Sequence, residues 1–130
     1  MPTQEIPAYE WARFFDECTR QHRRGLVTIE LLGLNIGDQV KARNLPLEGI
    51  MVVPNEVGED QITIVAGDQP EAHISHTIAS PSRVWLKQSD EGVDEALEIE
   101  YFDGAVLLKF RPAVLPDILD RTLANEARAM

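Results

Sequence analysis

The stretch from Ala96 to Phe110 constrains the fold of this chain more than any other. From Leu97 to Tyr101 every second residue is apolar and the residues between are glutamates, which is the pattern of a strand with one dry and one wet face. Asp103-Gly104 then supplies the residue pair of a two-residue type I′ hairpin turn. The alternation returns from Val106 to Phe110. The sequence therefore predicts a β-hairpin here.

Similar patterns recur along the chain and predict further strands. One segment is interrupted by Asn44-Leu45-Pro46, where proline should mark a bulge or an edge because it cannot donate to a ladder. We expect a meander of six or seven short antiparallel strands, whose curvature is compatible with a small SH3-like barrel. Besides the two hairpin strands, the expected strands are 26–32, 61–66, 72–78 and 83–88, with 38–42 and 47–53 as the two parts of the interrupted segment.

Two segments have the apolar spacing of amphipathic helices. Between Trp11 and Cys18, apolar residues fall at i, i+3, i+4 and i+7, with Pro7 in the first turn and Gly25 as the stop. A second helix is expected from Leu115, again with a proline near its start. The predicted fold is therefore α+β, with an N-terminal helix, the sheet and a C-terminal helix. No linker divides residues 1–130, so we expect a single domain.

Composition limits the cellular setting. The first residues lack the basic and apolar regions of a secretory signal, and no uncharged apolar run approaches the length needed to span a bilayer. A single cysteine, Cys18, cannot form an internal disulfide and is expected to be a buried residue in a reducing compartment. We therefore predict a cytoplasmic protein without a membrane segment.

The charge distribution argues against nucleic acid as a partner. The formal net charge is −10, and between Glu56 and Asp103 only two basic residues oppose twelve acidic ones. Such a surface repels phosphate backbones, whose binding needs cationic side chains.

His73 and His76 are the first candidates for a metal site. A regular strand sends these two positions to opposite faces, and the apolar neighbours of His76 place it on the inner face. A bulge could bring the two together, so zinc stays an alternative to a structural role. No cofactor motif and no recognisable catalytic constellation is present, so we predict no cofactor and favour binding over catalysis.

Arg20, His22, Arg23 and Arg24 form a basic cluster in a chain that is otherwise acidic. Cations at the C-terminus of a helix offset the partial negative charge of its free carbonyls. The alternative is a site for an anion or an acidic partner. Trp85 is the other candidate interaction residue, because strand alternation places it on the outer face. We expect a terminal helix to cover it, with contact to a second copy in a homodimer as the alternative.

Several phrases of the chain resemble a bacterial family that is defined only as a domain of unknown function. The resemblance implies a single-domain protein without an assigned activity, and it carries no catalytic residue onto this chain. The phrases are 10–15, 26–30, 42–50, 76–78 and 94–100.

The residues favour a non-enzymatic binding or protein-interaction module, self-associating through a strand edge or the Trp85 face. The alternative is a small-molecule or metal-binding domain, with unrecognised enzymatic activity, that uses His73, His76 and nearby acids.

Overall fold

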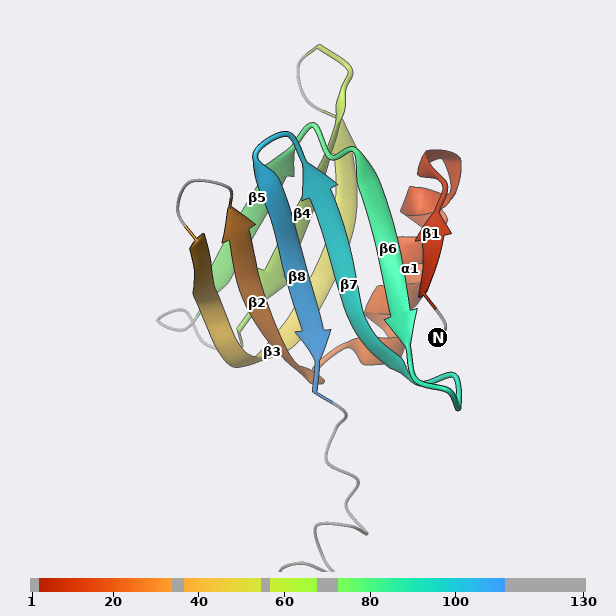
Figure 1. Ribbon diagram of the computed structural model, residues 1–130, viewed down its shortest axis with the longest axis vertical. Coiled ribbons are helices and arrows are strands. Elements are labelled where there is room, and N and C mark those ends of the chain that lie inside the picture. The colour runs from red at the N-terminus through yellow and green to blue at the C-terminus, as the bar shows by residue number, and fades with distance from the viewer. Residues whose placement is uncertain (1–2, 34–36, 55–56, 68–72, 112–130) are drawn as a thin grey trace, which may run out of the picture.

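A computed structural model describes residues 3–33, 37–54, 57–67 and 73–111. In this part of the chain, one α-helix and a short 3₁₀ turn accompany eight antiparallel strands that form one sheet in the order β1-β6-β7-β8-β2-β3-β4-β5 (Figure 1). The α+β class is confirmed, while the expected strand number was too low. The elements are β1 (Thr3–Ile6), η1 (Ala8–Glu10), α1 (Trp11–His22), β2 (Leu26–Gly33), β3 (Gly37–Pro54), β4 (Asp60–Ala66), β5 (Ile74–Ala79), β6 (Arg83–Gln88), β7 (Asp94–Tyr101) and β8 (Gly104–Phe110).

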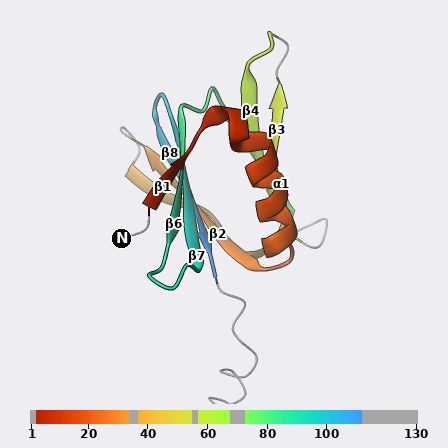
Figure 2. The same cartoon turned by 90° about the vertical axis from the view of Figure 1, so that its right-hand side faces the viewer.

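The long strand β3 folds the sheet into two layers. Its first part pairs with β2 and its second part pairs with β4. Near the end of the first part the register shifts, because Val27 lies opposite Leu45 while Ile29 lies opposite Ala42, and Asn44 takes a positive φ of 55°. The bulge expected near the proline is therefore confirmed, but the chain continues as one strand rather than two. The strand thus passes from the front layer to the back layer (Figures 1 and 2).

The expected SH3-like barrel is wrong, because the sheet stays open. Its two terminal strands, β1 and β5, lie at opposite ends of the strand order and do not pair with each other. A strand at the chain start was not expected either: Thr3–Ile6 pairs with β6, which is remote in sequence. The predicted C-terminal helix falls in 112–130, outside the described residues.

Helix α1 closes one open side of the bent sheet (Figure 2). Its predicted apolar stripe is confirmed, because Trp11, Phe15 and Cys18 are buried. The Trp11 Nε1–H donates to the Ile6 carbonyl at 2.8 Å, which joins the helix start to β1. Thr19 Oγ1 lies 3.0 Å from the Ile50 N–H and accepts its hydrogen bond. The helix thus supplies both apolar cover and a hydrogen-bond partner for the free edge of β3.

The core lies between the two layers and α1. One cross-strand row of the front layer runs through Leu86, Leu97, Leu108 and Ile29, all of them buried. Each fully buried aliphatic side chain of this size contributes about 1.5–3 kcal/mol relative to exposure. The inner face predicted from the alternation of apolar residues is therefore the face that holds the layers together.

The predicted β7–β8 hairpin is confirmed, but its turn lies one residue earlier than expected. Tyr101 pairs with Gly104, so the two turn residues are Phe102 and Asp103. Neither has a positive φ, so the expected type I′ turn was wrong. Gly104 is required for another reason: a Cβ at this position would collide with the Leu32 carbonyl oxygen on the neighbouring strand β2.

Candidate binding site at the basic end

The corner after α1 carries two of the arginines that the sequence singled out. The helix ends at His22, Arg23 is its C-cap residue, and Arg24 takes a left-handed conformation with a φ of 70°. Gly25, the expected stop, follows this turn and has no positive φ. The Arg24 N–H donates to the Leu47 carbonyl at 2.8 Å, which fixes the corner against β3.

Arg20 lies apart from this corner. Its guanidinium is 3.4 Å from the carboxylate of Asp16 one helical turn earlier, and both side chains are 68% exposed. Exposed pairs of this kind stabilise a helix by about 0.3–0.5 kcal/mol. Arg20 does not line the hollow beside the helix end, so the structure separates it from Arg23 and Arg24.

The first of two adjoining hollows lies where the end of α1, the start of β2 and the end of β8 meet, and the second lies between β2, β3 and the end of β8. The ends of α1 and β8 and the start of β2 lie toward the lower end of the molecule in Figure 1. The first has a volume of about 410 Å³ and the second of about 310 Å³, and both include Phe110 and Arg111. Strands remote in sequence bring further cations to them. We call this region the basic end and define it by Arg23, Arg24, Arg43, Lys109 and Arg111.

The cations of the basic end differ in their partners. Lys109 Nζ lies 3.0 Å from the Glu30 carboxylate, and Arg23 lies 3.9 Å from Glu48. Arg111 donates instead to the neutral Asn44 Oδ1 at 2.8 Å. Within the described residues, Arg24 and Arg43 form no ion pair. Three guanidinium groups at the basic end therefore lack a carboxylate partner.

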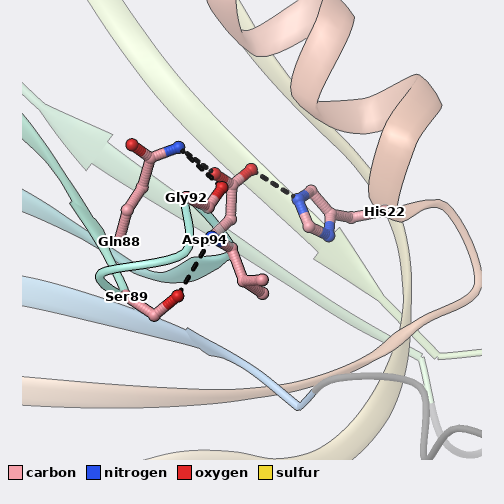
Figure 3. A network of polar contacts seen from close by, with 6 residues as sticks. His22, Gln88, Ser89, Gly92 and Asp94 are labelled. Carbon is pink, nitrogen blue, oxygen red and sulfur yellow. Dashed lines mark hydrogen bonds and ion pairs between the residues drawn. The ribbon is translucent and has the colours of Figure 1, made fainter.

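A polar network forms one wall of the first hollow (Figure 3). His22 Nε2 lies 2.8 Å from Asp94 Oδ2, and the other oxygen of Asp94 accepts a hydrogen bond of 2.8 Å from the Gln88 side chain. The His22 ring also stacks on Phe110, with ring centroids 4.0 Å apart. The imidazole is therefore held on one face and at one nitrogen, which fixes its orientation.

Cys18 lies one helical turn before His22 and is buried. Burial, and to a smaller extent the negative charge of Asp94, raises the pKa of its thiol to about 12. Because the thiolate is the nucleophilic form, the thiol is inert at neutral pH. The expectation of a buried structural cysteine agrees with this environment.

The two candidate metal ligands do not come together. His73 is exposed and precedes β5, whereas His76 lies within β5 on the same face as Ile74 and the buried Ile78. Burial and the nearby Lys41 lower the pKa of His76. Across the described segments, no three His, Cys, Asp or Glu side chains gather in a way that could hold a metal ion.

Trp85 lies on the outer face of β6 and is half-buried. Its Nε1–H donates to the Glu100 carboxylate at 3.1 Å. Helix α1 packs on the other face of the sheet, mainly against β3. Within the described residues, therefore, no helix covers Trp85, and its contact with a second copy stays a prediction.

The sequence did not reveal the full basic end. Arg43, Lys109 and Arg111 lie on β3 and at the end of β8, far in sequence from the cluster after α1. Asp94 is 72 residues from its partner His22. A weak signal existed for Lys109 and Arg111, which flank a predicted core phenylalanine. Only the strand order, however, places Arg111 beside the end of α1.

Comparison with known proteins gives the family. A model described as "Family of unknown function (DUF5335)" matches residues 2–118. The chain belongs to this family. An uncharacterized protein of Aquifex aeolicus (strain VF5) is 27% identical over 119 residues, which cover 90% of this chain and 100% of that protein.

The resemblance to a bacterial family of unknown function is thereby confirmed. No solved structure matches the chain significantly. No helix in the described segments has the length and apolar character that crossing a membrane requires.

Proposed function

We propose that this protein is a non-enzymatic protein-interaction module whose basic end binds an acidic segment of a partner protein. The observation that carries the proposal is the concentration of five of the chain's twelve lysines and arginines around two adjoining hollows, in a protein of net charge −10. The single buried Cys18 suits a cytoplasmic setting.

The guanidinium groups that have no carboxylate partner among the described residues define the chemistry of the ligand. Arginine presents a planar fork of donors that matches a carboxylate with two parallel hydrogen bonds. Arg24 lines the first hollow, Arg43 the second, and Arg111 both. A ligand that lies across Arg111 would therefore meet three cations in succession, which suits two or more carboxylates spaced along an extended chain.

The first hollow adds an apolar requirement. The stacked rings of His22 and Phe110 line it together with Leu26 and Val93, and these two aliphatic side chains are 37% and 52% exposed. Exposed apolar groups beside a charged rim are typical of an interaction site. The best-fitting segment carries an apolar side chain next to its acidic residues.

The shape favours a peptide over a small molecule. Sites for small molecules usually enclose most of the ligand surface, whereas both hollows are open to solvent. The thiol of Cys18 is also buried and its pKa is raised, so this residue supplies no nucleophile to the first hollow. These observations support recognition rather than catalysis.

Fluorescence anisotropy with two labelled peptides tests the proposal. The first peptide alternates glutamate with leucine, and the second replaces each glutamate by lysine. We expect binding of the first only, and a loss of at least about tenfold in affinity in the triple variant R24Q/R43Q/R111Q. Arg13→Gln is the matched control, because Arg13 is an exposed arginine of α1 that lies outside both hollows.

Three outcomes would overturn the proposal. Equal binding of both peptides would show contact through the apolar groups alone. Unchanged affinity in the triple variant, with the fold verified by circular dichroism, would place the site elsewhere. Binding of inorganic phosphate or of a single-stranded oligonucleotide more tightly than the acidic peptide would identify a different class of ligand.

A further inference from the structure

The two ends of the sheet present their backbones differently. Among the residues that the structure describes, strands β1 and β5 each pair on one side only, with β6 and β4 respectively. A terminal strand exposes a row of free N–H and C=O groups that can pair with another chain. β1 is poorly suited to pairing with another chain, because it has only four residues, carries the charged Glu5 and is followed by Pro7. β5 has six residues, Ile-Ser-His-Thr-Ile-Ala, without acid, base (His76 apart) or proline.

We propose that β5 pairs antiparallel with β5 of a second copy, so that the two sheets form one continuous sheet across a two-fold axis. This contact lies on a strand far from the basic end and does not depend on the proposed function. It is isologous, since the same strand contributes from both copies, and it therefore closes as a dimer.

The alternation within β5 selects one register. With the two-fold axis at His76, Ile74 of one copy lies opposite Ile78 of the other, and Ser75 lies opposite Thr77. In the observed fold Ile74, His76 and Ile78 share the inner side, while Ser75 and Thr77 are exposed on the outer side. This register therefore places apolar residues opposite apolar ones and hydroxyls opposite hydroxyls. A slip by one residue would set each apolar side chain against a polar face.

Charge also favours this strand over the other free edges. Two copies that each carry a net charge of −10 repel one another, so their contact must lie where acidic side chains are absent. β1 contains Glu5, and the first part of β3, whose outer edge is also free, contains Asp38. β5 contains no carboxylate. Burial and Lys41 on β3 lower the pKa of His76, so the residue at the axis is neutral at pH 7.

Cysteine crosslinking tests the register directly. In the double variant S75C/T77C, each new thiol lies opposite its counterpart in the second copy, at the separation of directly opposed strand residues that a disulfide can bridge. We expect the double variant to form a covalent dimer under mild oxidation, and each single variant to remain monomeric on a non-reducing gel. Gln4→Cys on β1 is the control for random collision, and Cys18 stays buried in all of them.

Light scattering over a dilution series tests the contact without new thiols. We expect the wild type to be dimeric at high concentration, and Ser75→Lys to shift the midpoint of dissociation upward by at least about tenfold, because lysine on an edge strand blocks pairing. Gln4→Lys on β1 should leave the midpoint unchanged. Ser75 is exposed, so both variants are expected to fold.

The opposite results overturn the proposal. A wild type that is monomeric at high micromolar concentration excludes the dimer. Crosslinking of S75C alone places the axis at another residue. Dissociation by Trp85→Glu but not by Ser75→Lys assigns the contact to the outer face of β6.

Discussion

The two open sides of the bent sheet differ in whether a helix covers their strand edges. On one side, the free edge of β3 meets α1 and the corner after it: Thr19 pairs with Ile50, and Leu47 exchanges backbone hydrogen bonds with Arg24 and Gly25. On the other side, β5 pairs with β4 and has no second partner strand among the described residues. In the described part of the chain, the one α-helix covers the edge of the second part of β3 and leaves the edge of β5 without such cover. The edge of β3 is therefore protected by α1, while the edge of β5 is not. Substitutions on the two sides should change the stability of the fold by different amounts.

The largest effect is expected from Phe15 on the closed side. Phe15 is fully buried on the inner face of α1. Phe15→Ala should therefore lower the free energy of unfolding by about 3–5 kcal/mol, because apolar burial is lost and a cavity is left. Urea denaturation measures this value. Phe14 is the control, because it contacts Phe15 edge-to-face but is only half-buried, and its alanine variant should lose clearly less. Equal losses would mean that α1 is not docked by this stripe.

A smaller effect separates two threonines, one on each side. Thr19→Val keeps the side-chain shape but leaves the Ile50 N–H without its partner, which should cost about 1–3 kcal/mol in unfolding free energy. Thr63→Val removes an exposed bond of 3.0 Å to Thr77 on the open side and should change stability by less than about 0.5 kcal/mol. Paired urea titrations compare the two. Equal losses of unfolding free energy would show that the hydrogen bond between Thr19 and Ile50 stabilises the fold no more than the exposed bond between Thr63 and Thr77.

The smallest effect concerns pH and the open side. Because the pKa of His76 is lowered in the folded state, folding favours its neutral form. Its contribution is complete above the unfolded value of about 6.5 and is lost as the pH falls from there through the folded pKa. Thermal melts between pH 7 and pH 5 should therefore show a steeper loss for the wild type than for His76→Gln.

Protein concentration sharpens this measurement. If two copies meet at His76, the difference between wild type and variant should grow with concentration, because protonation of both imidazoles opposes pairing. Identical pH profiles at every concentration would remove His76 from both roles.

Local sequence patterns predicted most of the helices and strands, but not whether the sheet closes into a barrel. The alternation around Leu97 and the stripe from Trp11 to Cys18 determine which faces are buried, since burial follows the strand and helix periods. The turn of the last hairpin was predicted at the wrong position. Glycine at position 104 is required by the close approach of the Leu32 carbonyl on another strand, and not by the conformation of the turn. β1 was missed because four residues with three exposed side chains carry no alternation signal.

The candidate site was even less accessible to sequence reasoning. Arg23 and Arg24 could be found because they adjoin in sequence. Arg111 could not, since its place beside them depends on β8 lying next to β2, an arrangement set by long-range pairing. The same holds for Asp94 and His22. Charge clusters assembled by topology have no linear pattern that would predict them.

The pairing of β1 with β6 has a consequence for how the protein is made. β1 leaves the ribosome well before β6, the strand with which it pairs. Until then β1 has no partner strand, and unpaired strand edges invite aggregation or chaperone binding, whereas α1 can already pack against β3. Contacts between distant segments also slow folding. β1 is thus synthesised early but can pair only late, so a substitution that weakens β1 should affect a late step of folding.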